Sequence, residues 1–320
     1  MQAAIATVDH RIDFVDIPQP ECGPEEVLIE VKAAGVNRAD LSQRKGSYPP
    51  PAGAPDTLGL ECAGTVAAVG DNVSRWRVGE RVCALLAGGG YAEFALVDEG
   101  SVFSLPDEIS FELAACFPEA VCTVWANVFM RSALQRGESI LIHGGTSGIG
   151  VMGLQMARHC GASRIFTTAG TDEKTALARR LGADVAINYK TEDFVEIIRA
   201  AGGVDVILDM VGGDYVQKNI SITNLNGRIC NIAFQNGFQT AVDFQPVLMN
   251  RLTLTATTLR SRSTTEKRQI RDAIEQHIWP AVTSGTIRPI LDKTFPLAQA
   301  EAAHQYMSAG SHSGKIVLLV

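Results

Sequence analysis

The sequence predicts an α/β protein of two domains, a doubly wound parallel sheet accompanied by a β-rich domain. Three observations carry this prediction. The chain has 320 residues, about twice the usual domain length. Residues 1–120 hold short apolar runs separated by glycine and proline, which is typical of a small barrel or sandwich. From Ser139 onward, apolar runs alternate with amphipathic segments of roughly ten residues, which indicates βαβ units.

In the β-rich region, we expect strands over the short apolar runs at 27–32, 63–69, 81–86 and 91–97. In the alternating region, strands are expected at 139–143, 164–169, 185–188, 204–209, 227–232 and 252–257. Helices are expected between them at 148–160, 172–181 and 192–200. Right-handed crossovers between parallel strands then give a doubly wound fold.

The C-terminal part predicts that the second domain is inserted into the first. An amphipathic helix is expected over 266–284, and the chain closes on a strand over 314–320. A lone terminal strand needs a sheet to join, and we expect it to return to the N-terminal domain. The predicted domains are therefore 1–120 with 260–320, and 121–259.

Composition limits the functional classes. The formal charge of −7 opposes binding to nucleic acid or to an anionic membrane surface. We expect no stretch long and apolar enough to span a bilayer, and the first 16 residues lack a signal-peptide pattern, so a cytoplasmic location is expected. The seven cysteines are odd in number and form no C-x-x-C pair, which predicts reduced, mostly buried thiols.

The sharpest local motif is a glycine-rich loop directly after one predicted strand and before a helix. We assign cofactor binding to its residues Gly145, Thr146, Ser147, Gly148, Ile149 and Gly150. Small residues let the backbone approach a pyrophosphate, and the helix N-terminus supplies free N–H groups. Against G-x-G-x-x-G, serine replaces the second glycine. With the alternating strands and helices that follow, the loop predicts nucleotide binding rather than a plain turn.

The next strand predicts which nucleotide binds. NAD sites usually place an acidic residue at the tip of this strand, where it binds the ribose 2′-hydroxyl. Here the tip carries no acid, and Thr171, Lys174 and Tyr189 lie nearby in the sequence. These side chains suit a 2′-phosphate, so NADPH is the expected cofactor. Asp172 and Glu173 would oppose it only if they pointed inward, and we expect them to face solvent or cap the helix.

Competing motifs fail on spacing. A short-chain dehydrogenase needs Tyr-x-x-x-Lys, but Tyr215 and Lys218 are one residue too close. Ser147 is not a hydrolase nucleophile, because G-x-S-x-G lacks its second glycine here. The six histidines show no i, i+4 pairing and no cluster with cysteines at metal-ligand spacing, so no metal site is predicted.

The N-terminal region resembles a known family. The segment 34–40, A-G-V-N-R-A-D, is similar to the A-G-V-N-x-x-D segment of zinc-independent quinone oxidoreductases in the medium-chain dehydrogenase/reductase superfamily. The segment 58–66 matches their next signature, and the likeness extends over the whole chain. Segments 168–170, 188–190 and 259–262 most resemble the p53-inducible quinone oxidoreductases. The resemblance implies a GroES-like catalytic domain and a Rossmann domain that binds NADPH.

The departures from zinc alcohol dehydrogenases are informative. Those relatives carry a cysteine ligand where this chain has Asn37 and a histidine ligand where it has Leu60. Their four-cysteine lobe is replaced by the turn at 88–90. The resemblance gives Glu61 a structural part, such as pairing with a buried arginine or backbone. Without a Lewis acid, the acceptor should be electron-poor, as a quinone or an enone is.

By resemblance, Asn37 and Tyr48 are the candidate catalytic residues at the nicotinamide end, and both also bind the cofactor. Further cofactor contacts are expected from Thr123, Phe234, Leu259, Arg260 and Lys315. For Lys267, Arg268 and Arg271 we expect only a solvated helix face.

The resulting prediction is an NADPH:quinone oxidoreductase, with an ortho-quinone as a suitable substrate. Direct hydride transfer to a bound quinone is expected, although one-electron reduction stays open. Two alternatives remain: an NADPH-dependent reductase of α,β-unsaturated carbonyl compounds, and a non-catalytic NADPH-binding protein like the crystallin and RNA-binding relatives. A homodimer is expected through the edge strand at 252–257.

Overall fold

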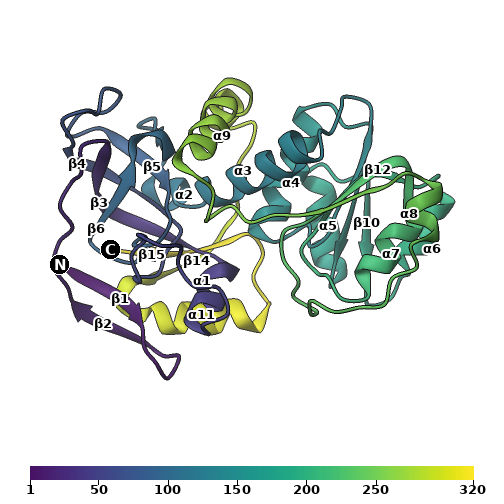
Figure 1. The fold of residues 1–320 in the computed structure, drawn as a ribbon, viewed down its shortest axis with the longest axis horizontal. Helices are drawn as coiled ribbons and strands as arrows, with labels where there is room; N and C mark the ends of the chain where they lie inside the picture. The colour runs from purple at the N-terminus through teal and green to yellow at the C-terminus, as the bar shows by residue number, and fades with distance from the viewer. The chain divides into compact units, whose positions relative to one another are not determined.

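The computed structural model describes all 320 residues, which form two compact units (Figure 1). One unit, here called the discontinuous unit, comprises Met1–Cys122 and Leu259–Val320. The other, the inserted unit, comprises Thr123–Thr258. The boundaries expected from the sequence, 120/121 and 259/260, lie one or two residues away.

The discontinuous unit is built mainly of strands. They are β1 (Gln2–Ala6), β2 (Ile12–Asp16), β3 (Glu26–Val36), β4 (Glu61–Val69), β5 (Arg81–Leu85), β6 (Phe94–Asp98), β7 (Val102–Ser104), β14 (Leu291–Pro296) and β15 (Lys315–Leu319). Its helices are α1 (Arg38–Arg44), α2 (Phe111–Ala114), α3 (Pro118–Val124, ending in the inserted unit), α9 (Thr264–His277), α10 (Trp279–Thr283) and α11 (Ala300–Ala309). Short 3₁₀ turns lie at Glu99–Ser101 and Leu297–Gln299.

The main sheet of this unit confirms the return of the terminal strand. Its order is β14-β15-β3-β4-β5-β7, with β6 also paired to β3. Strand β15 pairs antiparallel to β3, with Ile316 opposite Val36. One continuous apolar core, which includes Ile29, Tyr91 and Leu318, therefore joins both ends of the chain.

The inserted unit is a six-stranded, wholly parallel sheet of order β10-β9-β8-β11-β12-β13. The strands are β8 (Ser139–Ile142), β9 (Arg164–Ala169), β10 (Val185–Asn188), β11 (Val204–Asp209), β12 (Thr223–Asn231) and β13 (Thr253–Ala256). The helices are α4 (Gly148–His159), α5 (Asp172–Arg180), α6 (Phe194–Ala200), α7 (Tyr215–Ile222) and α8 (Gln245–Met249).

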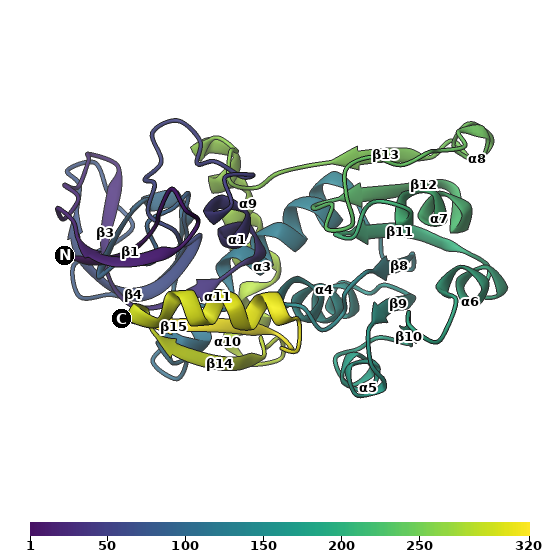
Figure 2. The same ribbon diagram turned by 90° about the horizontal axis from the view of Figure 1, so that it is seen from below.

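This order confirms the predicted doubly wound fold. The chain runs outward from β8 to β10 and then returns to β11 to continue the other way. Right-handed crossovers therefore place α4 and α5 on one face of the sheet and α6 and α7 on the other, as Figure 2 shows. Ligands of such sheets bind at the carboxyl ends of the strands, where the order reverses between β8 and β11.

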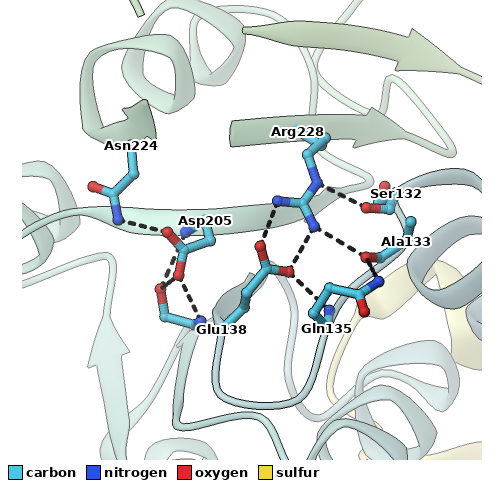
Figure 3. Close-up of polar contacts among 8 residues, drawn as sticks. Ser132, Ala133, Gln135, Glu138, Asp205, Asn224 and Arg228 are labelled. Atoms are coloured by element: carbon cyan, nitrogen blue, oxygen red, sulfur yellow. Dashed lines mark hydrogen bonds and ion pairs between the residues drawn. The ribbon is translucent and has the colours of Figure 1, made fainter. Parts of the chain in front are cut away.

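A polar network closes the opposite end of this sheet (Figure 3). Arg228 on β12 forms two hydrogen bonds with the Glu138 carboxylate, of 2.8 and 2.6 Å, and donates to the carbonyls of Ser132 and Ala133. On β11, Asp205 accepts from the Asn224 amide and from the backbone and side chain of Ser139, the latter two at 2.8 and 2.7 Å. The network joins the loop before β8 to strands β11 and β12.

Two expectations for the C-terminal part are wrong. The helix expected over 266–284 is two helices, because Pro280 lies in the first turn of α10 and α9 ends at His277. Its basic residues do not form a solvated face. Lys267 is buried and donates to the Arg260 carbonyl, while Arg268 forms ion pairs with Asp98 and Glu25.

Arg271 is also buried, at 4% exposure. Spacing alone did not reveal that the 3₁₀ turn at Glu99–Ser101 packs against α9.

One helical segment, Phe111–Arg131, is long and apolar enough to span a membrane by length and composition, contrary to the sequence expectation. It includes a π-helical part, Trp125–Arg131. In its most apolar window, 78% is buried inside the protein, which is typical of a core helix.

Candidate functional site

The glycine-rich loop lies between β8 and α4, where the sheet order reverses. Two of its glycines are required by close backbone approach. A Cβ on Gly150 would lie 2.2 Å from the Gly144 carbonyl oxygen, and one on Gly145 would lie 2.2 Å from the Thr167 hydroxyl. Ser147, which replaces the second glycine of the fingerprint, is the N-cap of α4. Its hydroxyl accepts a hydrogen bond from the Gly150 N–H at 3.0 Å.

The N–H groups of the loop divide into two sets. Those of Gly144, Gly145, Ser147 and Gly150 are used within the inserted unit. Those of Thr146, Gly148 and Ile149 have no hydrogen-bond partner in the structure. Three free donors at the positive end of a twelve-residue helix are suited to an anion such as a pyrophosphate.

The residues assigned to the 2′-phosphate lie at the tips of β9 and β10. The Thr171 hydroxyl caps α5 by accepting from the Lys174 N–H at 3.2 Å. Tyr189 is half exposed, and its hydroxyl would lie 2.7 Å from a Cβ on Gly170, so only glycine leaves room for the ring there. Asp172 is exposed and accepts from the Asn188 amide at 2.7 Å. Thr171, Gly170 and Tyr189 thus lie together at one edge of the sheet.

Two further predicted residues belong to the inserted unit. Thr123 is buried, and its carbonyl accepts from the Asn127 amide at 2.7 Å in the helix that continues α3. Phe234 follows β12 and packs against Gly212 and the Phe238 ring, whose centroid lies 5.3 Å away. Both strand-end loops, after β11 and after β12, therefore meet at Phe234.

In the discontinuous unit, Asn37 and Lys315 come together on Glu61. The Asn37 amide donates to the Glu61 carboxylate at 2.9 Å, and the Lys315 ammonium donates to Asn37 Oδ1 at 2.6 Å and to Glu61. The second Glu61 oxygen accepts from the Glu119 N–H at 3.0 Å. Glu61 thus pairs with a buried lysine and backbone, where an arginine or backbone was expected.

Burial perturbs the acids around this cluster. It raises the pKa of Glu119 to about 8, with the neighbouring Glu61 adding to the effect. It also raises the pKa of Asp40 to about 6, against hydrogen bonds from the N–H groups of Asn37 and Gly59. Carboxyl groups held partly protonated near neutral pH are typical of functional sites, although structural clusters show them too.

Tyr48 and Arg260 also come together in this unit. The Arg260 guanidinium carbon lies 5.7 Å from the centroid of the Tyr48 ring, and the side chain donates to the carbonyls of Ala87 and Tyr48. Arg260 is 4% exposed, and its Nη2 atom has no hydrogen-bond partner. A buried guanidinium with a free donor can bind an anionic or carbonyl group. Leu259, beside it in the chain, is buried.

Sequence reasoning missed two buried polar clusters. In one, Tyr91 donates to Asp40 and lies 3.1 Å from His304 Nε2, and burial lowers the pKa of His304 to about 4. In the other, His143 connects Thr168 to Asn219 below the glycine-rich loop. His143, a polar residue at the end of the apolar strand β8, is the sequence signal for the second cluster, and the first joins residues of α1, α11 and the loop before β6 that no local pattern connects. No three His, Cys, Asp or Glu side chains are arranged to hold a metal ion.

Comparisons with known proteins decide the family. A domain model described as "Alcohol dehydrogenase GroES-like domain" matches residues 23–107, and one described as "Zinc-binding dehydrogenase" matches residues 181–318. The quinone oxidoreductase of Lama guanicoe is 30% identical over 313 residues, covering 96% of this chain and 92% of the relative. The chain belongs to the quinone oxidoreductase family. The predicted membership of the medium-chain dehydrogenase/reductase superfamily is confirmed.

Solved structures of relatives agree with the family and its fold. A mycobacterial protein whose structure contains NADPH is 32% identical, with a TM-score of 0.87 and full coverage of both chains. The CurK enoyl reductase is 27% identical, with a TM-score of 0.84 over 99% of this chain and 98% of that one. The family's GroES-like and Rossmann domains correspond to the two units described above.

Proposed function

We propose that this protein is an NADPH-dependent quinone oxidoreductase that works without zinc. The observation that carries the proposal is the set of three unpartnered N–H groups of Thr146, Gly148 and Ile149 at the start of α4. They fit the pyrophosphate of a dinucleotide. Relatives named quinone oxidoreductase, and a related structure containing NADPH, support the same cofactor and acceptor.

Different residues would hold different parts of the cofactor. Thr171, Lys174 and Tyr189 would hold the 2′-phosphate, since β9 ends in Ala169 and not in an acidic residue, and the nearby Asp172 carboxylate is bonded to the Asn188 amide. Thr123, Phe234 and Leu259 would line the nicotinamide half. Asn37 and Lys315 would orient the nicotinamide ribose or carboxamide, exchanging part of their mutual hydrogen bonding for bonds to the cofactor.

Tyr48 and Arg260 would orient the acceptor or the nicotinamide, because the Arg260 Nη2 donor is buried and unused. When bound, NADPH supplies a hydride from nicotinamide C4, and the quinone takes up that hydride and one solvent proton to become a hydroquinone. The chain contributes proximity, orientation and exclusion of water. The metal-independence rests on residues 37 and 60, where asparagine and leucine are unsuitable zinc ligands.

A second candidate activity is reduction of α,β-unsaturated carbonyl compounds. The likeness to the CurK enoyl reductase favours it. An enone also accepts hydride without a Lewis acid, so the same site suits both acceptors.

Loss of nicotinamide absorbance tests the proposal, with NADPH beside NADH, 9,10-phenanthrenequinone as acceptor and a chelator present. Fast oxidation of NADPH with little of NADH is the expected result. Faster turnover with an enone would favour the second activity, and loss of activity in the chelator would contradict the zinc-free mechanism. Tight NADPH binding without turnover would favour a non-catalytic role.

We also propose a cytoplasmic homodimer formed through β13. This strand is at the edge of the parallel sheet, with one side unpaired. Exposed apolar side chains gather on it and on α8, namely Leu254, Leu248 and Met249. Light scattering at micromolar concentration should give twice the 34.2 kDa chain mass, and a monomeric mass would contradict the dimer.

A further inference from the structure

A chain of buried polar side chains crosses the inserted unit directly below the glycine-rich loop. It joins five residues from four strand ends and one helix. They are His143 after β8, Thr168 on β9, Asp209 on β11, Asn231 on β12 and Asn219 on α7. All five are buried, and none of their polar side-chain atoms lacks a partner. Such a network is costly unless every member is satisfied, so each position is constrained by its neighbours.

The hydrogen-bond partners fix the direction of this chain. Asn219 Nδ2 donates to the Asp209 carboxylate at 3.1 Å, which turns its oxygen towards His143. That oxygen lies 2.9 Å from His143 Nε2 and can only accept, so Nε2 carries the proton. Burial lowers the pKa of His143 and keeps the ring neutral. Nδ1 is therefore an acceptor, and the Thr168 hydroxyl, 3.0 Å away, donates to it.

The direction of these hydrogen bonds determines how Thr168 contacts the glycine-rich loop. Because the Thr168 hydroxyl donates its proton to His143, its oxygen accepts from the Gly144 N–H, 3.3 Å away. The Thr168 carbonyl accepts from the next N–H, that of Gly145, at 3.0 Å. Thr168 thus anchors the first two N–H groups of the loop, and the three free donors of the proposed pyrophosphate site follow immediately after them.

We propose that His143 is a positioning residue for nucleotide binding, which acts through Thr168 to hold the glycine-rich loop with its free N–H groups directed at the pyrophosphate. The proposal rests on the NADPH-binding function proposed above. His143 does not touch the cofactor in this scheme. Its ring packs edge-on against Phe194 and Tyr215, at centroid distances of 5.1 and 4.9 Å, and those two rings also contact each other. An apolar ring could fill this slot, so packing alone does not require imidazole.

The test uses the full chain and isosteric variants of β9. Thr168→Val removes the hydroxyl that links His143 to the loop, and Thr168→Ser keeps it. The control is Ser139→Ala, which removes a buried hydroxyl on the neighbouring strand β8, one that donates to Asp205 at 2.7 Å at the opposite end of the sheet and not to the chain below the loop. His143→Phe is the direct variant, and Thr168→Val decides the matter if that protein does not fold.

Two ligands separate positioning of the loop from general loosening. NADPH carries the pyrophosphate, whereas adenosine 2′-monophosphate reaches only the 2′-phosphate end. We expect Thr168→Val and His143→Phe to weaken NADPH binding about tenfold, the effect of one lost anchoring hydrogen bond. Binding of adenosine 2′-monophosphate should not change, Thr168→Ser should retain NADPH binding, and Ser139→Ala should bind both ligands like the parent.

The inference is overturned if Thr168→Val binds NADPH as Ser139→Ala does, or if both ligands weaken equally. A parent protein that binds no NADPH would instead overturn the proposed function. Hydrogen exchange of residues 143–150 in the free protein then still tests the anchor. Faster exchange in Thr168→Val than in Ser139→Ala supports it, and equal exchange overturns it.

Discussion

The two ends of the parallel sheet are held by polar networks of opposite character. At the amino ends of β8 and β11, the Arg228–Glu138 ion pair is partly exposed and makes direct charge-to-charge contacts (Figure 3). At the carboxyl ends, neutral side chains, from Thr168 through His143 to Asn219, lead to a single buried carboxylate, Asp209. The same sheet therefore uses charge at one end and directed neutral hydrogen bonds at the other.

The difference follows from what each end has to do. The amino end binds no ligand in this fold, so a strong ion pair can close it without competing with anything. The carboxyl end must leave N–H groups free for an anion. An acidic side chain close to the loop would repel that anion. The one carboxylate of this network, Asp209, accepts hydrogen bonds from the N–H of Val211 and the amide of Asn231. Stability and binding should therefore respond to different substitutions.

The largest effect on stability is expected at the amino end. Arg228→Met removes four hydrogen bonds and leaves the Glu138 carboxylate unpaired. The free energy of unfolding should fall by about 2 to 3 kcal/mol, without a change in NADPH binding. Urea unfolding and NADPH titration measure the two quantities.

Arg158→Met is the matched control for that substitution. Arg158 forms an ion pair of 2.6 Å with Asp184, but the side chains are 43% and 38% exposed, against 20% and 26% for Arg228 and Glu138. Such a surface pair should contribute less than about 1 kcal/mol. Equal losses in the two variants would show that the amino-end network is no more than a surface contact.

At the carboxyl end, Gly150→Ala should act on binding first. The added Cβ would lie 2.2 Å from the Gly144 oxygen, so the loop must move, and the NADPH dissociation constant should rise at least about tenfold. Gly153→Ala on the same helix meets only the flexible end of Ile142 at 2.9 Å and should bind normally. An unchanged constant in Gly150→Ala, measured by fluorescence titration, would argue against the loop as the binding site.

Lowering the pH should weaken the carboxyl-end network around His143 before the amino-end network around Glu138. The pKa of His143 is lowered by burial, so the unfolded chain takes up a proton near pH 6.5 before the folded one does, and stability falls as pH falls below 6.5. The pKa of Glu138 is lowered by its hydrogen bonds to Arg228, so its contribution is lost only below about pH 4.5.

Between pH 7.5 and 5.5, the parent should lose more stability than His143→Phe, because only the parent has this histidine to protonate on unfolding. Unfolding measured at both pH values checks this, and His304, whose pKa is also lowered by burial, cancels in the difference. Ring nitrogen shifts in NMR spectra should also show His143 in its Nε2–H form at pH 7.5. An imidazolium at that pH would contradict the directed chain.

The smallest effect concerns Ala133, whose carbonyl accepts from Arg228 while its φ is 47°. An alanine in the left-handed region is strained, and Ala133→Gly relieves that strain. Glycine also makes the unfolded chain more flexible, so the free energy of unfolding should rise by only about 0.5 kcal/mol. Ala157→Gly, in the interior of α4, should lower it by about 1 kcal/mol or more. A loss in both variants would mean that Ala133 is not strained.

Elements that depend on local pattern were predictable from the sequence. The six parallel strands lie within a few residues of their expected ranges. For interior strands such as β8 and β11, continuous apolar runs mark burial on both faces. Strands β1, β2, β7 and β14 and helices α1, α2, α7, α8 and α11 were not predicted. Strand β14 is largely exposed and gains its place by pairing with β15, a contact that local composition does not encode.

The sequence by itself determined the doubly wound fold, the family and the place of the glycine-rich loop between a strand and a helix, because each depends on runs of residues adjacent in the chain. Only the tertiary structure decided which loop N–H groups are free, since Thr168 lies 24 residues beyond Gly144. It likewise decided that Lys315, 254 residues from Glu61, holds the Asn37 cluster. Hydrogen bonds form between atoms that folding brings together, and sequence spacing carries no record of such pairs.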